Sequence, residues 1–198
     1  VLIISDEIHQ DLITGSTPFT SALSVSNGGS VDHMITLSSV SKSFNMASLH
    51  QAEVIIPNEA LRHQYDAYKA QVYHTDADVI AETAITAAYT HPEAEAWLDD
   101  VRAVIRENYE YLCDELLSAL PKLRISPMDG TYLAWIDFIA YVRAEDMHDL
   151  FENQCRIAPS FGEWFGGESY ATFVRLNLAT SLANIKVATH SIINHIRT

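Results

Sequence analysis

Three short apolar runs, at residues 1–5, 33–39 and 52–56, dominate the first part of the chain. Residues 1–4 are continuously apolar, and the other two segments combine apolar residues with polar ones, a pattern that indicates buried strands in a parallel sheet. Polar residues follow each run, so we expect the three strands to gather chemically active side chains at one edge of a sheet. Residues 15–29 are rich in Gly, Ser, Thr and Pro, which predicts a surface loop between the first two strands.

The segments that follow these strands have the signals of helices. A helix over residues 59–72 has Asn58 as its candidate N-cap. The next helix ends near residue 89, and its candidate N-cap is Asp76 or Asp78. A long helix is predicted from Pro92 to about residue 120, because apolar residues recur there at spacings of three and four.

The pattern changes after Pro121 to that of a smaller unit of paired strands and helices. The elements predicted there are strands at 123–126, 131–138, 156–159 and 171–177, a helix over 144–154 and a last helix to residue 196, capped by Ser181. We therefore expect an α/β chain in which residues 1–120 belong to a large domain and residues 121–198 form a small α+β carboxyl-terminal domain. The apolar run at Val1 is an unusual start for a protein, so we expect a fragment of a longer one.

Composition and charge narrow the classes of partner. The chain has 48% apolar residues and 12 Lys and Arg against 26 Asp and Glu, a net charge of −14, which argues against binding to nucleic acid or anionic lipid. No run approaches the length of a membrane span and no signal peptide is evident, so a cytoplasmic location is expected. Cys113 and Cys155 have no disulfide or zinc spacing, HExxH is absent, and no metal site is expected.

Two basic residues are candidates for chemistry. Lys42 lies in Ser38-Ser39-Val40-Ser41-Lys42-Ser43, just after an apolar strand and several positions from any acidic residue. Such a lysine can act as an amine nucleophile, although a surface lysine on a loop has the same local pattern. Arg175 lies within an apolar strand, where a charge needs a partner, and a ligand carboxylate could supply it.

Five segments in order then carry a resemblance to a known family. SDEIHQDL, SSVSKSFNMASL, IIPN, GTYLAWIDF and FVRLNLAT closely resemble motifs of the pyridoxal-5′-phosphate (PLP) enzymes of aminotransferase class I/II, in particular the cystathionine β-lyase-like (C–S lyase) branch. The interval of 42 − 6 = 36 residues between Asp6 and Lys42 is compatible with that family. The resemblance covers the whole chain but only the carboxyl-terminal half of the family's plan.

The resemblance implies a role for each candidate residue. Lys42 would hold PLP as a Schiff base and move the substrate Cα proton, Asp6 would pair with the pyridine nitrogen, and Arg175 would take the substrate carboxylate. The cofactor-binding residues that it implies are Lys42, Asp6, His9 near the phenolic oxygen, and Ser39 and Ser41, whose hydroxyls would donate to the phosphate.

The resemblance also implies the activity. We expect a C–S lyase that eliminates the sulfur group of cystathionine or cysteine, a small amino acid substrate, in a homodimer. Two alternatives stay open: a PLP-dependent aminotransferase that uses a 2-oxo acid, and a non-catalytic remnant or interaction module.

Several features depart from the family or have a simpler interpretation. His50 stands where many aminotransferases have a phosphate-binding arginine, and the amino-terminal half, which supplies the wall that stacks on the cofactor ring, is missing. Trp164 and Phe165 are interpreted as packing between domains. Glu7 and Asp11 are interpreted as solvated charges.

Overall fold

The structure is a computed structural model that describes residues 1–72 and 78–197, the side chains of residues 26–28 excepted. Its residues group into two compact units, Val1–Asp99 and Asp100–Thr198, each of which combines strands with helices. The division falls inside the long helix α4 (Pro92–Ala119). The domain boundary at residue 120 stays a prediction.

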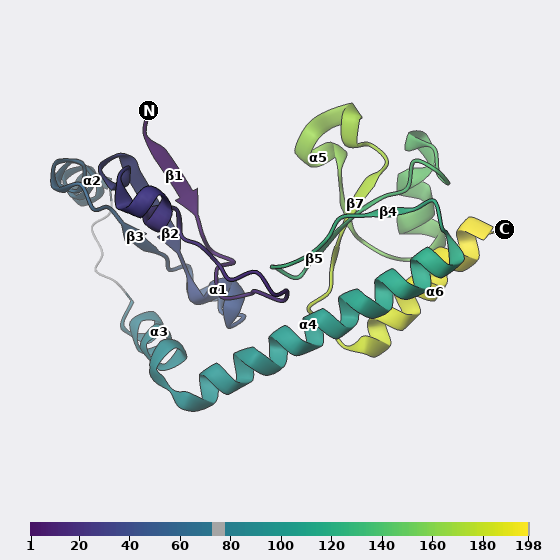
Figure 1. The fold of residues 1–198 in the computed structure, drawn as a ribbon, viewed down its shortest axis with the longest axis horizontal. Helices are drawn as coiled ribbons and strands as arrows, with labels where there is room; N and C mark the ends of the chain where they lie inside the picture. The colour runs from purple at the N-terminus through teal and green to yellow at the C-terminus, as the bar shows by residue number, and fades with distance from the viewer. Residues whose placement is uncertain (73–77, 198) are drawn as a thin grey trace. The chain divides into compact units, whose positions relative to one another are not determined.

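The first unit contains a three-stranded sheet in the order β1 (Ile3–Asp6), β2 (Met34–Ser38), β3 (Glu53–Ile55), as Figure 1 shows. β1 and β2 are parallel, so their carboxyl ends meet at the same edge, as expected. β3 is antiparallel to β2. The prediction that all three strands end at one edge is therefore wrong for β3, whose carboxyl end lies at the other edge.

β1 is exposed, although its apolar run predicted a buried strand. Ile3 and Ile4 keep 43% and 62% of their surface accessible. The reason is that β1 is an edge strand, hydrogen-bonded on one side only, and the described residues do not cover its side chains. The apolar pattern correctly predicted a strand but not the layer needed to bury it.

The helices of the first unit have the predicted caps. In α2 (Glu59–Val72) the N–H of Leu61 donates to Asn58 Oδ1 at 3.0 Å. In α3 (Val79–Thr90) Asp78 Oδ1 accepts from the N–H groups of the first turn, whereas Asp76 lies outside the described residues. The short helical elements are η1 (Ala22–Gly28), η2 (Val31–His33), α1 (Val40–Ser43) and η3 (Ala47–Leu49).

The second unit contains a four-stranded antiparallel sheet in the order β4 (Arg124–Ile125), β5 (Leu133–Asp137), β7 (Phe173–Asn177), β6 (Ser160–Phe161). Three strands agree with the predicted ones. The strand predicted at 156–159 is wrong: Arg156 has a φ of +60°, and Pro159 has no N–H for a ladder, so the strand begins at Ser160.

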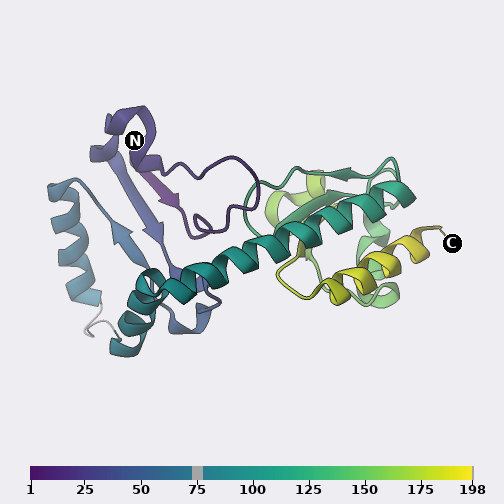
Figure 2. The same cartoon turned by 60° about the horizontal axis from the view of Figure 1, so that its bottom comes forward.

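Helices cover one face of this second sheet. α6 (Leu182–Arg197) runs alongside the later turns of α4 in both views (Figures 1 and 2), and Arg197 Nη2 donates to the carbonyl of Ala119 at 2.7 Å. The core between helices and sheet consists of fully buried apolar side chains, among them Leu112, Leu116, Ala134, Ile136, Val174 and Ile192.

The remaining helical elements of the second unit are η4 (Ala144–Asp146), η5 (Asp149–Gln154), α5 (Glu163–Gly166) and η6 (Gly167–Tyr170). The helix predicted over 144–154 thus forms as a 3₁₀ turn followed by a π-helical segment. Within the described ranges, the helices are too short or too polar to cross a membrane.

Candidate functional site

The shared edge of β1 and β2 brings together the first predicted pair of site residues. Asp6 is in register with Leu37, and the N–H of Glu7 donates to the carbonyl of Leu37 at 2.8 Å. The segment that carries Lys42 begins directly after β2. Asp6, the last residue of β1, and Lys42, four residues after β2, therefore lie at the carboxyl ends of adjacent parallel strands, which is where open α/β sheets place their ligands.

Lys42 is held on α1, a single helical turn with a strong cap. Ser39, in an extended conformation, accepts a hydrogen bond from the N–H of Ser41 at 3.1 Å. The turn closes when the N–H of Phe44 donates to the carbonyl of Val40 at 2.9 Å. This cap explains the hydroxyl-rich sequence around the lysine, because small hydroxyls are favoured at helix starts.

The ammonium of Lys42 has no partner among the residues that the structure describes. Its side chain is half-buried, and no hydrogen bond or ion pair joins it to the residues that the structure describes. A lysine in that state is available to a ligand. The sequence prediction of an amine without a carboxylate beside it agrees with this geometry.

Asp6 keeps one carboxylate oxygen open. Its Oδ1 accepts from the N–H of Ile8 at 3.2 Å, which fixes the turn after β1, and the side chain is exposed. His9 lies half-buried in the same turn, where its carbonyl accepts from the N–H of Leu12 at 3.0 Å. The edge of the sheet thus carries an acid and an imidazole on one segment and an amine on the next.

The two predicted phosphate-binding serines differ in availability. Ser39 is buried, and its single hydroxyl proton is donated to the carbonyl of Gln51 at 2.7 Å. The hydroxyl of Ser41 has no partner among the described residues. Ser41 is therefore the freer donor for a ligand, and His50, at the position of the family's arginine, is exposed.

Asp11 supports α1, although the sequence suggested a solvated charge. Asp11 Oδ2 accepts hydrogen bonds from Ser43 Oγ at 2.8 Å and from Tyr89 Oη at 3.1 Å. Burial, with the charge of Asp11, raises the pKa of Tyr89 to about 12, so that Tyr89 stays a neutral donor near neutral pH. The ring of Phe44 packs against Tyr89 and Trp97, each at a centroid distance of 5.9 Å.

Glu7 also has a structural role that the sequence did not reveal. The residue is only 8% exposed, and its Oε1 accepts from Ser5 Oγ, Ser21 Oγ and the N–H of Ala22. These bonds hold the long loop after β1 against the end of the strand. The solvated-charge interpretation was therefore wrong for Glu7 as well as for Asp11.

Arg175, in the second unit, has N–H donors that no hydrogen bond to the described residues uses. In β7, its Nη2 donates to Ser160 Oγ at 3.3 Å, and its guanidinium carbon lies 4.5 Å from the centre of the Phe165 ring. Nε is buried without a partner, and no carboxylate of the described residues forms an ion pair with this arginine. The guanidinium is thus oriented by an aromatic ring and a hydroxyl but not neutralised, as expected for an arginine that awaits an anion.

The loop that carries Phe165 has its shape fixed by glycines. A Cβ on Gly162 would lie 2.3 Å from the carbonyl oxygen of Tyr170, and one on Gly166 would lie 2.2 Å from the ring of Tyr170. Gly167 has a φ of +64°, which disfavours other residues. The glycine-rich sequence therefore allows the loop to pack closely against Tyr170 and is not a loose linker.

Replacing Phe165 by leucine should loosen the guanidinium of Arg175. A cation–π contact contributes about 0.5–1 kcal/mol, so hydrogen exchange of the Arg175 Nε–H should accelerate about 2- to 5-fold, as measured by ¹⁵N NMR. Trp164→Leu is the matched control, because Trp164 packs on Phe161 and not on Arg175. Equal acceleration in both variants would contradict a specific role for Phe165.

The start of α5 should depend on pH through His148. His148 Nε2 lies 3.0 Å from Glu163 Oε1 and its Nδ1 lies 3.5 Å from Glu152 Oε2, and the hydrogen bond to Glu163, more than that to Glu152, raises the pKa of His148 above 6.5. Because the folded pKa is raised, the stabilisation is fully present below about pH 6.5 and is lost as the pH rises through the folded value. Urea unfolding at several pH values should show this loss in the wild type, and His148→Gln should remove it. A pH profile unchanged by that substitution would contradict the assignment.

Comparisons with known proteins identify the family of the chain. The family model for aminotransferase class I and II matches residues 1–192. Among curated proteins, Protein MalY of Escherichia coli (strain K12) is 33% identical over 200 residues, all of this chain and 49% of its own. Cystathionine beta-lyase PatB of Bacillus subtilis (strain 168) is 32% identical over 189 residues, 94% of this chain and 47% of its own.

Solved structures agree as well. Cystalysin from Treponema denticola, which contains a pyridoxal 5′-phosphate cofactor, superposes with a TM-score of 0.92 at 26% identity, over 100% of this chain and 49% of that one. A PLP-bound C–S lyase from Staphylococcus hominis superposes with a TM-score of 0.86 at 28% identity, and the match covers 100% of this chain and 49% of that one. The chain spans about half the length of the curated relatives it matches. By its motifs, its fold and the extent of the match, it belongs to the aminotransferase class I and II family.

Proposed function

We propose that the chain acts, as part of a longer enzyme, in PLP-dependent C–S lysis of a small sulfur amino acid such as cystathionine or cysteine. The observation that carries this proposal is the placement of Lys42 and Asp6 after adjacent parallel strands, with the amine of Lys42 left without a described partner. The names of the relatives, cystathionine beta-lyase and C–S lyase, support the choice of reaction.

The residues present fit the cofactor. The unpartnered amine of Lys42 would hold its aldehyde carbon, the open oxygen of Asp6 would face its pyridine nitrogen, and Ser41 would donate to its phosphate. Ser39 would join Ser41 only if its hydroxyl proton left Gln51, and His9 would lie near the ring. When bound, PLP supplies an electron sink for the negative charge that develops at the substrate Cα.

Each residue then has a defined task in the elimination. Arg175 would bind the substrate carboxylate through its fork of N–H donors, with Phe165 behind the guanidinium. Lys42 would take the proton from the substrate Cα as a general base. Asp6 would keep a proton on the pyridine nitrogen by its negative charge. The sulfur group would leave from Cβ as a thiol, and hydrolysis of the remaining three-carbon fragment by one water molecule would give pyruvate and ammonia.

The setting of the enzyme is part of the same proposal. We infer a homodimer and a cytoplasmic location from the family resemblance. The net charge of −14 supports a small-molecule substrate over a nucleic acid.

Two other functions use the same residues. Amino transfer to a 2-oxo acid is favoured by the match to the aminotransferase family model. A non-catalytic module is favoured by the length, which is about half that of the curated relatives. All three functions differ in what the protein does with PLP and with cystathionine.

A two-step experiment separates the three. The purified protein is mixed with PLP, and a visible absorption band that borohydride reduction removes is expected. Cystathionine is then added without a 2-oxo acid, and release of thiol and pyruvate is expected. Amino transfer that requires a 2-oxo acid would instead favour the aminotransferase, and the absence of the band would contradict catalysis by this chain.

A further inference from the structure

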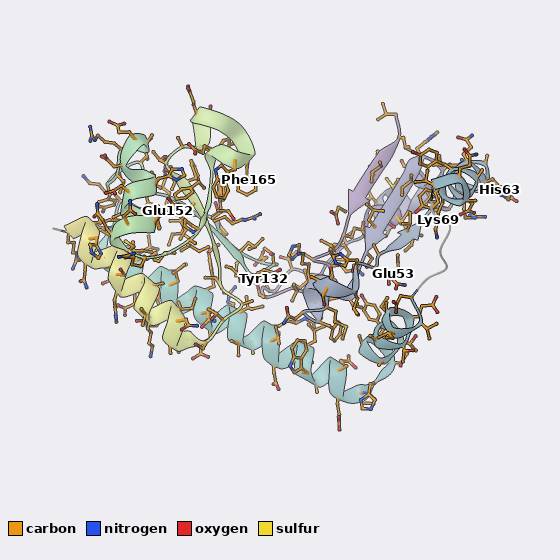
Figure 3. The ribbon with its side chains drawn as sticks, turned by 180° about the vertical axis from the view of Figure 1, so that it is seen from behind. Glu53, His63, Lys69, Tyr132, Glu152 and Phe165 are labelled. Carbon is orange, nitrogen blue, oxygen red and sulfur yellow. The ribbon has the colours of Figure 1, made fainter. Side chains whose placement is uncertain are left out.

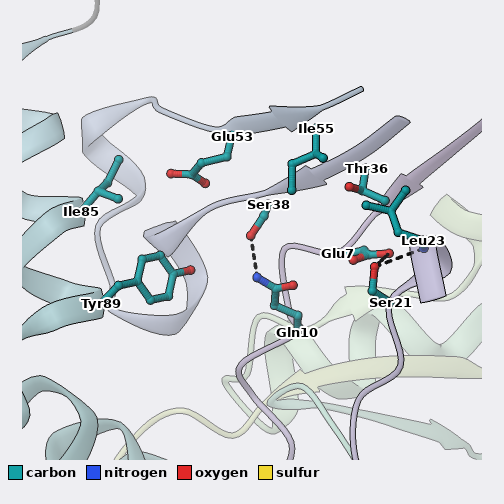
Figure 4. A pocket seen from close by; sticks show the side chains of 10 residues that line it. All are labelled: Glu7, Gln10, Ser21, Leu23, Thr36, Ser38, Glu53, Ile55, Ile85 and Tyr89. Carbon is teal, nitrogen blue, oxygen red and sulfur yellow. Dashed lines mark hydrogen bonds between the residues drawn. The ribbon is translucent and has the colours of Figure 1, made fainter. Parts of the chain in front are cut away.

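A pocket lies on the face of the first sheet opposite to Asp6. In β2 the side chains of Thr36 and Ser38 alternate with that of Leu37, which is in register with Asp6, so they point to the other face. On that face the sheet and α3 form an open pocket of about 260 Å³ (Figure 4). Lys42 and Asp6 do not line it, so this pocket is separate from the proposed cofactor edge.

Glu53 provides the pocket with an unpaired carboxylate. Both of its Oε atoms are buried and accept no hydrogen bond from the described residues. Among the hydroxyls that line the pocket, Tyr89 Oη donates to Asp11, and Ser38 Oγ accepts from Gln10 Nε2 at 2.7 Å; neither forms a hydrogen bond with Glu53. A buried carboxylate without donors is strongly unfavourable, so a ligand that brings donors would be bound there.

The other polar residues of the lining also favour a ligand that donates hydrogen bonds. Glu7 adds a second carboxylate, and the lining contains no lysine, arginine or histidine. Thr36 is 2% exposed, and its Oγ1 has no hydrogen-bond partner in the described part of the chain. The pocket therefore combines negative charge with an unused hydroxyl that can accept a hydrogen bond.

Apolar side chains separate these polar groups. Ile55 and Ile85 face each other across the pocket beside Glu53, and Leu23 lies near Thr36 (Figure 4). Ile3, in register with Met34 and so on the same face as Thr36, is 43% exposed and adds apolar surface. A ligand of matching chemistry would have a cationic head and an apolar stem.

We propose that this pocket binds a protonated amine or guanidinium carried on an apolar stem, with Glu53 as its counter-ion. Two sources have this chemistry: a free alkylamine or alkylguanidine, and a lysine or arginine side chain of a polypeptide segment that packs on this face of the sheet. Glu53 would compensate the positive charge of the ligand, Thr36 Oγ1 would accept a hydrogen bond from its N–H, and Ile55 would pack along its apolar stem.

Titration with n-butylguanidinium chloride tests the site directly. Saturable shifts of the Ile55 and Ile85 methyl signals in NMR are expected for the wild type, and Glu53→Gln should weaken binding at least tenfold. Glu59→Gln is the matched control, because Glu59 is exposed on α2 and the substitution removes the same charge. Binding that is equal in both variants, or equal for neutral n-butanol, would overturn the proposal.

Stability without ligand gives a second readout. If Glu53 awaits a cation, Glu53→Gln should raise the thermal midpoint of the free protein and abolish the rise caused by n-butylguanidinium. A purely structural carboxylate would instead lose stability on neutralisation, and that result would overturn the proposal. Thr36→Val should weaken binding of n-butylguanidinium a few-fold, and this variant tests the proposal if Glu53→Gln does not fold.

The peptide Ac-Val-Leu-Arg-Leu-Val-NH₂ and its glutamine analogue distinguish the two sources. Tighter binding of the arginine peptide than of n-butylguanidinium, with loss in the analogue, supports the site and points to a polypeptide segment. Binding of the small cation alone supports it as a site for a free amine. If neither cation binds saturably, the proposal fails, whatever the outcome with PLP.

Discussion

Replacing Lys42 by alanine should abolish the attachment of PLP and lower thiol release from cystathionine by at least about 10²- to 10⁴-fold, the usual contribution of a general base. Lys42 lies on the segment that follows β2, the strand paired with the one that ends at Asp6, and no partner among the described residues competes with the cofactor for its amine. Mass spectrometry after borohydride reduction measures the attachment, and a thiol assay measures the turnover.

Two further variants make the result specific. Lys69→Ala should keep both properties, because Lys69 is an exposed lysine on α2 (Figure 3). Lys42→Arg keeps the positive charge but offers no deprotonated amine, so it should fail as Lys42→Ala does. Label that persists in Lys42→Ala would show that another amine holds the cofactor.

The strands and helices that flank Lys42 were predictable because their signals are local. Asn58 and Asp78 are caps with the predicted contacts, and the hydroxyl run before Lys42 caps its helical turn. The exposure of Ile4 was not predictable, since an apolar run reports what a strand can bury and not which layer is present to cover it.

The supports of the site were missed because their partners are distant in sequence. Asp11 joins Ser43 and Tyr89, which lie 32 and 78 residues further along, and neither contact leaves a local pattern. Phe165 was interpreted as packing between domains, and its contacts with Arg175 and Trp135 inside the second unit were not predicted. The run of glycines around Phe165 was the available signal, because closely spaced glycines mark places where backbone and rings approach each other.

The unpaired state of Arg175 is the part of the site in which sequence and structure agree most directly. An arginine in an apolar strand requires a counter-charge, and the sequence contained none nearby. The structure leaves Nε without a partner and gives the guanidinium only a hydroxyl and an aromatic face. These contacts orient the guanidinium but leave its positive charge uncompensated, which is the basis for a strong prediction.

Replacing Arg175 by lysine should raise the KM for cystathionine about 10- to 100-fold, while kcat changes much less. A hydrogen bond to a charged group contributes about 1.5–3 kcal/mol, and lysine offers a point charge in place of the planar fork that matches a carboxylate. Arg143→Lys is the matched control in the same unit, since Arg143 is exposed and pairs with Glu145 and Asp146. A fall in kcat at unchanged KM would instead mean that Arg175 acts in the chemical step, because uniform binding to a carboxylate appears in KM alone.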